Sequence, residues 1–394
     1  MIAISIPTKP LGNVAKVISG YAFKSAEFCD EGIPVIKIKN IRVGTVDLDD
    51  AAYVAERFLK LDAKYHVGPG DLLISLTGSH PNQPNSVVGR VARMGAHQTS
   101  SLLNQRAGKI FLREKDSADL NYLYYVLSSP KFRNAVAMLA NGAASQANVS
   151  PTQAESLKIP LPDLPTQRRI AGILSAYDDL IENNLRRIRI LEEMAQSLYR
   201  EWFVHFRFPG HESVPLTDSP LGPIPQGWEV KKVKDVLLRL KAGEVYKQAD
   251  VSRQGIVPVI DQSTDEVLGY HDREPAHVAS IERPIAIFGD HTCKMQLMIT
   301  PFSIGPNVVP FIAKVNRPLL YVYYLIQNLA TTQEYKRHWT QLNSNKVPVS
   351  TEILSENFAT FCQPILDSIE QLKRRNQTLR QTRALLLPKL VTQS

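Results

Sequence analysis

A long heptad pattern in the middle of the chain constrains its fold more than any other feature. Between residues 168 and 202 apolar side chains recur in alternating steps of four and three, with no proline. This spacing is typical of a coiled-coil seam, and ordinary globular helices are only about 8–20 residues long. At about 1.5 Å per residue, the seam is roughly 48 Å long. Its positions are Ile170, Leu174, Tyr177, Ile181, Asn184, Ile188, Leu191, Ala195, Leu198 and Trp202.

The flanking residues predict where this helix begins and ends. Thr166 is the expected N-cap, and Pro209-Gly210 ends the pattern, so a central spacer helix is predicted over 166–207. Asp178 and Asp179 fall beside the seam and are expected to be solvated. Asn184 lies on the seam, where an amide costs stability but can fix register and partner.

The seam needs a partner helix, and the C-terminal segment 364–394 can supply it as a second spacer helix. Its seam is more polar than the first. The alternative is two separate amphipathic helices, each packed on its own domain; the length of the first helix argues against this. The second seam consists of Ile365, Ile369, Leu372, Asn376, Leu379, Arg383, Leu386 and Leu390.

The two blocks that flank the central helix resemble each other, which indicates an internal repeat. "YLYYVL" at 122–127 recurs as "YVYYLI" at 321–326, an offset of 199. "D-x-I-E" at 179–182 recurs at 367–370, an offset of 188. We interpret the difference as an 11-residue deletion that preserves the helix face, with the second half a shortened copy ending in a shorter helix.

Short β-branched runs within each block predict strands, as in "IPVIKIKNI" and "DLLISL", then "IVPVID", "PIAIFG" and "NVVPFIAKV". One helix is expected in each block, near 119–138 and 318–338. The fold class is therefore α+β. Two similar mixed α/β domains, 1–165 and 208–363, are separated by two long helices that form an antiparallel coiled coil.

Composition narrows the function. Lys and Arg number 46 against 38 Asp and Glu, a net charge of +8, which favours a polyanionic partner such as nucleic acid. No apolar run is long enough to span a bilayer, and no signal peptide is evident. Three scattered cysteines predict neither a zinc site nor a disulfide framework. A soluble cytoplasmic protein is expected.

No catalytic motif stands out. A phosphate-binding loop, HExxH, paired CxxC and an Asn-Pro-Pro-aromatic tetrapeptide are all absent from the sequence. Asp62-Ala63-Lys64 could end a nuclease motif, with Asp47, Asp49 or Asp50 upstream, but that tripeptide is common by chance. We expect no metal site and no catalysis in this chain.

The segment from Asn148 to Phe203 resembles the central region of specificity subunits of type I restriction-modification systems. The resemblance rests on a hydrophobic strand with prolines, Gln before a basic pair, an acidic pair, and a Leu-Glu-Glu-Met helix. Here these are Ile159-Pro160-Leu161-Pro162, Gln167-Arg168-Arg169, Asp178-Asp179 and Leu191-Glu192-Glu193-Met194. "IPVIKIKNI" and "GDLLIS" also resemble strands of the family's target-recognition domains. The second domain departs more from the pattern.

The resemblance implies two target-recognition domains that each read one half of a bipartite DNA sequence, with the paired helices as a ruler. It also implies two adenine methyltransferase subunits and a translocating restriction subunit as partners. S-adenosylmethionine, ATP and Mg²⁺ would then belong to those partners, and this chain would hold no cofactor. A spacer of this length corresponds to roughly 14 base pairs at about 3.4 Å each.

Polar loop residues after strands are the candidate DNA contacts, because bases are read by amide, hydroxyl and basic side chains and phosphates by Lys and Arg. In the first domain the candidates are Lys24, Lys37, Lys39, Asn40, Arg42, Thr77, Ser79, His80, Asn104, Gln105 and Arg106. In the second they are Lys247, Gln262, Ser263, His291, Thr292, Lys294, Asn343, Ser344, Asn345 and Lys346. The tyrosines at 122, 124, 125, 321, 323 and 324 are expected to pack in cores.

Four functions are considered for this chain, and one of them, a pure coiled-coil scaffold, is opposed by the two flanking domains. The leading one is a non-catalytic DNA-specificity subunit. A stand-alone DNA-binding regulator with the same fold is the alternative, and an adenine methyltransferase gene nearby would separate the two. An enzyme in its own right is disfavoured by the missing motifs.

Overall fold

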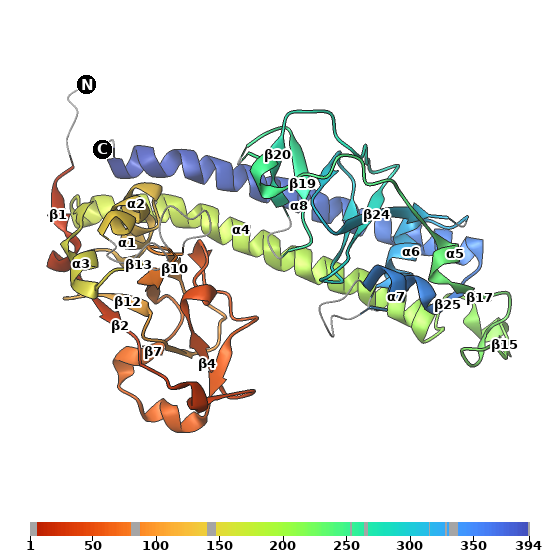
Figure 1. The fold of residues 1–394 in the computed structure, drawn as a ribbon, viewed down its shortest axis with the longest axis horizontal. Helices are drawn as coiled ribbons and strands as arrows, with labels where there is room; N and C mark the ends of the chain where they lie inside the picture. Colours follow the sequence, from red (N-terminus) through yellow and green to blue (C-terminus); the bar gives the residue numbers. More distant parts are fainter. Residues whose placement is uncertain are drawn as a thin grey trace. The chain divides into compact units, whose positions relative to one another are not determined.

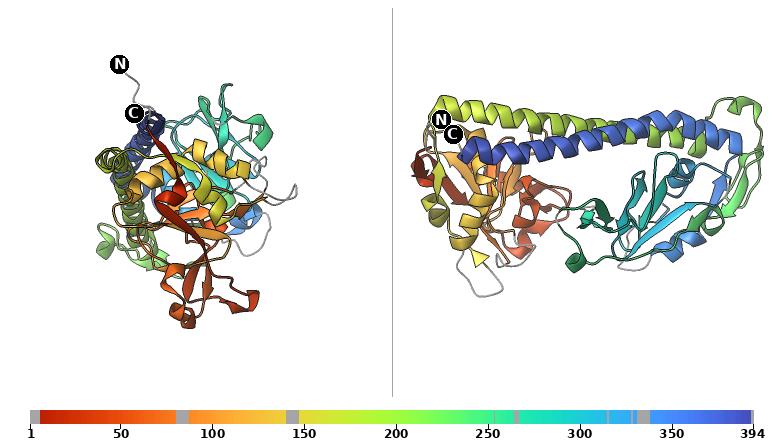
Figure 2. Two further views of the ribbon diagram at one scale, coloured as in Figure 1. Left: turned by 90° about the vertical axis from the view of Figure 1, so that its left-hand side faces the viewer. Right: turned by 90° about the horizontal axis from the view of Figure 1, so that it is seen from above.

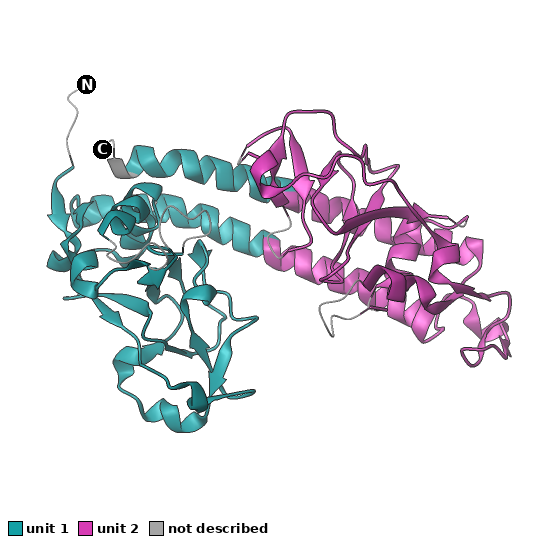
Figure 3. Cartoon of the chain, viewed as in Figure 1, with its two compact units in different colours: residues 1–184, 374–394 teal, residues 185–373 magenta. Residues whose placement is uncertain are grey.

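The computed structural model describes residues 6–79, 87–139, 147–252, 254–263, 267–314, 316–327, 329–330 and 338–392 (Figure 1). The chain forms two compact units, shown in Figure 3. Unit 1 comprises residues 1–184 and 374–394, and unit 2 comprises residues 185–373. Each unit therefore contains one mixed α/β domain together with part of both long helices.

Unit 1 contains two five-stranded sheets, ordered β2-β12-β8-β10-β5 and β3-β6-β4-β11-β7. The first sheet comprises β2 (Ala15–Ser19), β12 (Ala107–Leu112), β8 (Leu72–Ser75), β10 (Val91–Arg93) and β5 (Gly44–Thr45). The second comprises β3 (Phe28–Cys29), β6 (Ala52–Val54), β4 (Ile33–Ile36), β11 (Ser101–Leu103) and β7 (His66–Val67). Two further pairs, β1 (Thr8–Pro10) with β14 (Lys158–Pro160) and β13 (Ala147–Asn148) with β9 (Thr77–Gly78), are antiparallel.

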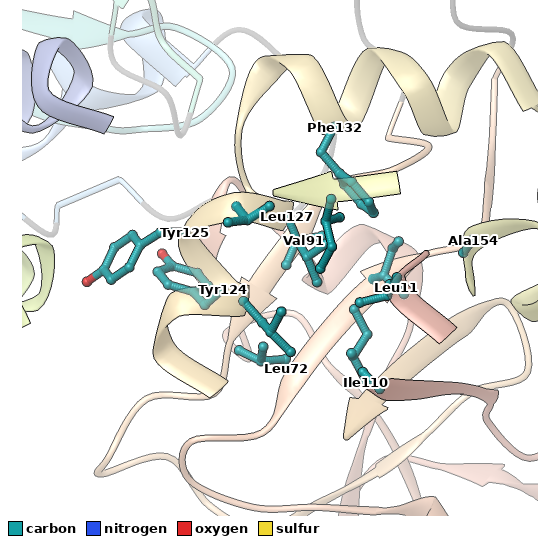
Figure 4. Packing of buried hydrophobic residues seen from close by; sticks show 14 of the residues in the cluster. Leu11, Leu72, Val91, Ile110, Tyr124, Tyr125, Leu127, Phe132 and Ala154 are labelled. Carbon is teal, nitrogen blue, oxygen red and sulfur yellow. The ribbon is translucent and has the colours of Figure 1, made fainter. Parts of the chain in front are cut away.

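Helices cover the first sheet of unit 1. The expected helix over 119–138 is two helices, α1 (Leu120–Leu127) and α2 (Pro130–Leu139), because Pro130 begins a new helix after a two-serine turn. The carboxylate of Asp119 caps α1 by accepting the Tyr122 N–H at 2.8 Å. Tyr122, Tyr124 and Tyr125 are buried, as predicted, in a core with Leu72 and residues of α3 (Pro151–Ser156) (Figure 4).

Unit 2 contains a four-stranded sheet, β18-β24-β21-β22, and a three-stranded sheet, β20-β19-β23. The first comprises β18 (Leu237–Arg239), β24 (Val308–Ala313), β21 (Ile285–Gly289) and β22 (Met295–Met298). The second comprises β20 (Val267–His271), β19 (Val257–Ile260) and β23 (Ser303–Ile304). The strand pairs β15 (Leu216–Thr217) with β16 (Ile224–Pro225) and β17 (Glu229–Lys232) with β25 (Lys346–Val349) are antiparallel. Its short helices are α5 (Val233–Val236), α6 (Leu319–Ile326) and α7 (His338–Ser344).

The strand orders confirm the internal repeat. β2-β12-β8-β10 of unit 1 matches β18-β24-β21-β22 of unit 2, and the parallel pair β4/β11 matches the parallel pair β19/β23. α1 and α6 begin at Leu120 and Leu319, at the predicted offset of 199. The offsets of 199 and 188 leave the position of the 11-residue difference open between residues 127 and 179. Residues 128–150, which include α2, connect α1 to α3, whereas only residues 327–337 connect α6 to α7, so the length difference lies before the long helices.

The two long helices differ from their predicted bounds. α4 runs over Leu164–Tyr199 and continues as a π-helical turn, Arg200–Val204. Asp163, not Thr166, supplies the cap, because its carboxylate accepts the Thr166 N–H at 3.1 Å. α8 runs over Glu352–Thr392, begins before residue 364 and, with 41 residues against 36, is longer than α4. In the two views of Figure 2, the α4 and α8 segments of each unit run side by side.

The predicted seam residues face the partner helix within each unit. In unit 1 the Asn184 amide donates to Asn376 Oδ1 at 2.9 Å, and Leu386 and Leu390 pack on the cluster that contains Ile170 and Leu174. In unit 2 Ile188 clusters with Ile369 and Leu372, flanked by Leu191 and Ile365. Of the other predicted seam positions, Ile181 and Ala195 are buried, and Tyr177, Leu198 and Leu379 are half-buried. The pairing is antiparallel, as predicted.

The α4 residue Asp178 corrects one expectation, because it is not solvated. Its carboxylate accepts a hydrogen bond from the Tyr125 hydroxyl at 2.7 Å and forms an ion pair with Arg383 of α8. Only 14% of its side chain is exposed. Asp178 therefore ties α1, α4 and α8 together, and this explains why the seam tolerates Arg383.

Replacing Asp178 by Asn is expected to lower the free energy of unfolding of unit 1 by about 1–2 kcal/mol, because hydrogen bonds to a charged group contribute more than neutral ones. Urea denaturation of the full chain measures the change. Asp179→Asn is the matched control, since that neighbour is exposed. Equal effects of the two variants would contradict a structural role for Asp178.

The end of α4 packs in an aromatic cluster of unit 2, as expected for Trp202 and Phe203. Phe358 of α8 is fully buried there, with its ring centroid 5.2 Å from that of Phe203 and 5.9 Å from that of Tyr199. Tyr321 and Tyr324 of α6 complete the cluster. This core fixes the unit 2 segments of both long helices to the α/β domain of that unit.

His277 gives unit 2 a dependence on pH. Burial lowers the pKa of this imidazole below its usual 6.5, and a hydrogen bond to the Ala242 carbonyl only partly opposes that effect. The folded protein thus binds fewer protons than the unfolded chain near pH 6, so stability is present above about pH 6.5 and falls as the pH drops through that value. We expect the melting temperature to fall between pH 7.5 and 5.5, and less steeply in His277→Gln. His97→Gln, at an exposed position, should keep the wild-type slope; an unchanged slope in both would exclude His277.

Candidate nucleic-acid interface

Parallel strands bring two predicted loops of unit 1 together. β4 and β11 run parallel, with Val35 opposite Leu102, so both loops leave from the same edge of the sheet. The backbone N–H of Asn104 donates to the Ile36 carbonyl at 3.0 Å across this edge. We name residues 37–42 and 104–106 the first reader edge.

The basic residues of the loop 37–42 have acidic partners nearby. Lys39 contacts Asp50 at 2.9 Å, and Arg42 contacts Asp47 at 3.3 Å. Both pairs are substantially exposed, and such pairs contribute little to stability, so they can open to a phosphate at small cost. The Lys37 ammonium lies 3.7 Å from the centroid of the Phe28 ring. Partial burial, and then the charge of Lys39, lower the pKa of Lys37.

Asn40 was predicted as a DNA contact, and the structure corrects this. Its side chain is fully buried. The amide nitrogen donates to the Asp47 carbonyl at 3.0 Å and to Asp50 at 3.1 Å, and the amide oxygen accepts the Lys37 N–H at 2.9 Å. Asn40 holds the loop in shape and presents nothing to a ligand.

The turn between β11 and β12 presents Gln105 and Arg106 to solvent. Asn104 is half-buried, and its Oδ1 accepts the Arg106 N–H at 3.4 Å, which shapes the turn. Gln105 can donate and accept hydrogen bonds, and Arg106 offers a planar set of donors that matches guanine or phosphate. This turn is the most accessible part of the first reader edge.

The other candidates of unit 1 lie elsewhere on its surface. Lys24 is exposed beside a 3-10 turn, and its backbone N–H donates to Glu27 at 2.7 Å. Thr77 and Ser79 follow β8 and are half-buried. The Thr77 hydroxyl has no hydrogen-bond partner in the part of the chain that the structure describes. His80 lies outside the described residues.

The same edge recurs in unit 2, where β19 and β23 run parallel and Gly305 N–H donates to the Ile260 carbonyl at 2.8 Å. Gln262 follows β19. Its side-chain oxygen accepts the His291 N–H at 3.0 Å, and its carbonyl accepts the Thr292 hydroxyl at 2.9 Å. We name residues 261–263, 290–294 and 305–307 the second reader edge. Predicted residues about 30 positions apart are thus brought into contact.

Two further contacts fix this edge. The Lys294 ammonium donates to the Ser263 carbonyl at 3.4 Å. Gly289 must lack a side chain, since a Cβ there would lie 2.8 Å from that of Gln262. The turn 290–294 therefore packs closely against Gln262, and polar side chains of five predicted residues share one surface. They are Gln262, Ser263, His291, Thr292 and Lys294.

The remaining candidates of unit 2 do not join the second reader edge through any contact among the described residues. The Asn345 amide donates to the Leu329 carbonyl at 3.2 Å, and the Ser344 hydroxyl donates to the Gln341 carbonyl at 2.7 Å, so both stabilise the end of α7. Asn343 is half-buried in that helix, and Lys247 is exposed on a 3-10 turn. Lys346 lines a separate hollow of about 490 Å³, which it shares with Lys231, Lys232 and Lys234.

Sequence reasoning missed one part of the second reader edge, the turn at Pro306 and Asn307. Both residues are exposed, and Asn307 has a left-handed backbone with φ of 61°. The turn joins β23 to β24, as Asn104–Arg106 joins β11 to β12. Aligning the repeat through these strands would have identified it.

Metal-binding side chains are not clustered in the part of the chain that the structure describes. No group of three or more His, Cys, Asp or Glu side chains there is placed to hold a metal ion. Asp62 caps a 3-10 turn, where it accepts the Lys64 N–H at 3.0 Å, so the Asp-Ala-Lys tripeptide has a structural role. No helix within the described ranges has both the length and the hydropathy needed to cross a membrane.

Comparisons with known proteins show which family of proteins the sequence resembles. Residues 6–193 match the model of the type I restriction modification DNA specificity domain. A Methanocaldococcus jannaschii protein assigned as the MjaX type I restriction enzyme specificity subunit is 23% identical over 383 residues, covering 92% of this chain and 87% of its own. The MjaIX specificity subunit of the same organism is 25% identical over 304 residues, covering 70% and 69%.

The fold is also found in a solved structure. The S subunit of a type I restriction-modification system from M. genitalium superposes with a TM-score of 0.55 at 17% identity, covering 100% of this chain and 98% of its own. Residues 6–193 thus carry a type I restriction modification DNA specificity domain, and the relatives matched over most of the chain are specificity subunits, which supports a function in DNA sequence specificity. The matches favour this reading over a stand-alone regulator.

Proposed function

We propose that this chain reads a bipartite DNA target, with the first and second reader edges each contacting one half of it. The repeated edge carries the proposal: in both units a parallel strand pair presents polar loops at equivalent positions. The net charge of +8 favours the DNA backbone as a partner. The length of the α4 and α8 helices would set the gap between the two halves.

The chain would act without catalysis of its own, in the cytoplasm, as a scaffold for two adenine methyltransferase subunits and for restriction subunits. The methyltransferases would modify an adenine in each half after flipping it from the stack. S-adenosylmethionine, ATP and Mg²⁺ would be held by those partners. The missing catalytic motifs and the match to the specificity domain support this division of labour.

Off-seam surfaces of α4, together with residues 157–165, are the proposed docking sites for the methyltransferases. Ile173, Leu180, Ile190 and Met194 remain between 41% and 53% exposed there and would offer apolar contacts to a partner. Arg186 and Arg187 lie between them and are exposed. Reversing both charges, as Arg186→Glu with Arg187→Glu, is expected to weaken co-purification of the methyltransferase at least tenfold. Undiminished complex formation would contradict docking at this site.

Methyladenine mapping by single-molecule sequencing tests the proposed function. DNA would come from cells that express this chain with its neighbouring methyltransferase, and from cells that express the methyltransferase alone. A modified motif with two short specified halves and an unspecified gap is expected only in the first. Identical methylation in both, with both proteins present, would exclude the proposal.

A further inference from the structure

One pair of facing seam residues in unit 1 is polar. The following pair along both helices, which belongs to unit 2, is apolar. The Asn184 amide donates to Asn376 at 2.9 Å, and both side chains are nearly fully buried, at 8% and 2% exposure. One helical turn further along the same two helices, Ile188 packs with Leu372 in unit 2. The Asn376 amide also donates to the Ile181 carbonyl of α4 at 3.5 Å, so both amides find their partners across the seam, whereas the next layer needs only apolar contact.

These two layers are copies of each other. With the offset of 188 between the two helices, Asn184 of α4 is equivalent to Leu372 of α8, and Ile188 of α4 is equivalent to Asn376 of α8. The pair Asn184–Asn376 is thus the counterpart of the pair Leu372–Ile188, with the roles of α4 and α8 exchanged. The two layers occupy equivalent positions of the repeat, but one consists of amides and the other of apolar side chains.

Internal repetition creates a competing arrangement. Since α4 and α8 are copies, α4 could pair with α4 of a second molecule in the same register. Asn184 would then face Ile188 of that molecule, and Ile188 would face its Asn184. Pairing of α8 with α8 would place Asn376 against Leu372 in the same way. Every amide would be buried without a partner, which is costly.

We propose that the Asn184–Asn376 pair selects α4–α8 pairing within one chain and excludes pairing between like helices of two chains. A single polar residue on a coiled-coil seam is known to choose register and partner in this manner. The ion pair between Asp178 and Arg383 also favours pairing within one chain. In pairing between like helices, Asp178 would face Ala195 and Arg383 would face Leu366, so neither charge would have its partner. This inference does not depend on DNA recognition.

Moving one amide between helices tests the proposal in the full chain. The variant Ile188→Asn with Asn376→Leu places both amides on α4 and none on α8. Within a chain each amide would face leucine, but between two copies Asn184 would face the new amide of the other α4. We expect a lower melting temperature and a dimer fraction that rises with concentration in light scattering after size exclusion.

The matched control moves the whole pair by one layer. Asn184→Ile with Asn376→Leu, combined with Ile188→Asn and Leu372→Asn, keeps amide facing amide within the chain. It should stay monomeric, with a melting temperature near that of the wild type. If both variants were monomeric with equal melting temperatures, the amides would not select the partner and the proposal would be overturned.

Cross-linking identifies the kind of dimer. In α4–α4 pairing, position 181 of one copy faces position 191 of the other, whereas within a chain these positions face 379 and 369. Two differently tagged copies of the relocated variant, one with Ile181→Cys and one with Leu191→Cys, should form a disulfide between the tags. A dimer without this cross-link, produced by exchange of α8 between chains, would count against the proposal.

If the variant Ile188→Asn with Asn376→Leu does not fold, a double-mutant cycle at Asn184 and Asn376 tests the proposal instead. Asn184→Ile and Asn376→Leu each leave one buried amide without its partner, so each single variant is expected to lower the melting temperature. The double variant should recover most of the loss. Single variants that melt like the wild type would show that the pair imposes no requirement on its partner.

Discussion

Replacing Phe358 by alanine is expected to destabilise unit 2 by about 3–5 kcal/mol, the usual cost of truncating a buried phenylalanine. Phe358 has no exposed surface, and its ring lies within 6.2 Å, centroid to centroid, of the rings of Tyr199, Trp202, Phe203 and Tyr324. Truncation would leave a cavity where the end of α4, the start of α8 and the helix α6 meet. Rigid aromatic neighbours cannot collapse to fill it.

Urea denaturation followed by tryptophan fluorescence measures this loss, because all three tryptophans, Trp202, Trp228 and Trp339, lie in unit 2. Phe361→Ala is the matched control on the same helix, since its ring is 63% exposed and touches only the edge of the cluster near Trp202. It should cost less than about 1 kcal/mol. Similar losses for the two variants would mean that the cluster does not fix the helices as described.

Replacing Arg106 by alanine is expected to reduce methylation of the proposed bipartite target by about 10–100-fold and to relax its first half only. A good bidentate contact from arginine to a base contributes about 1–3 kcal/mol of discrimination. Arg106 is exposed at the tip of the first reader edge, on a turn that Asn104 holds in shape. The second half should remain specified, because its reader edge is built from unit 2 alone.

Methyladenine mapping of cells that express the variant with its methyltransferase provides the measurement. Lys115→Ala removes an equally exposed charge from unit 1 outside the reader edge and controls for general loss of DNA affinity. Its expected pattern is that of the wild type. If Arg106→Ala left the first half intact, or relaxed both halves equally, the assignment of Arg106 to the first half would be wrong.

The long helices were predictable because their apolar spacing is a local property of the sequence. Their ends were less predictable. The second helix was predicted to begin at residue 364, yet α8 begins at Glu352 and passes through Pro364. Phe358 and Cys362 continue the seam into the core, and their burial outweighs one missing backbone hydrogen bond. The length difference between the repeats was predicted, but its position was not, since two offsets give an amount and only a range of possible positions.

The reader edges were predictable only in part. Residue type identified Gln262 and His291 as candidates, but their contact depends on strands far apart in the sequence. Residue type also selected Asn40, which is buried, because an amide suits a loop's own backbone as well as it suits a base. Lys346 was chosen for its charge and belongs to a different hollow. Burial and long-range pairing decide such cases, and neither can be read from loop composition.

The two-stranded pairs at the base of each target domain have a consequence for how new specificities arise. In unit 1, β1 pairs with β14, so Lys9 lies opposite Ile159; in unit 2, Lys231 lies opposite Val347 in the pair of β17 with β25. The chain thus enters and leaves each domain at neighbouring points, just before a long helix begins. Under the proposed function, the segment between those points could be exchanged as one piece. Recombination at the two junctions would then replace one proposed half of the recognition sequence and leave the helices and the other half unchanged.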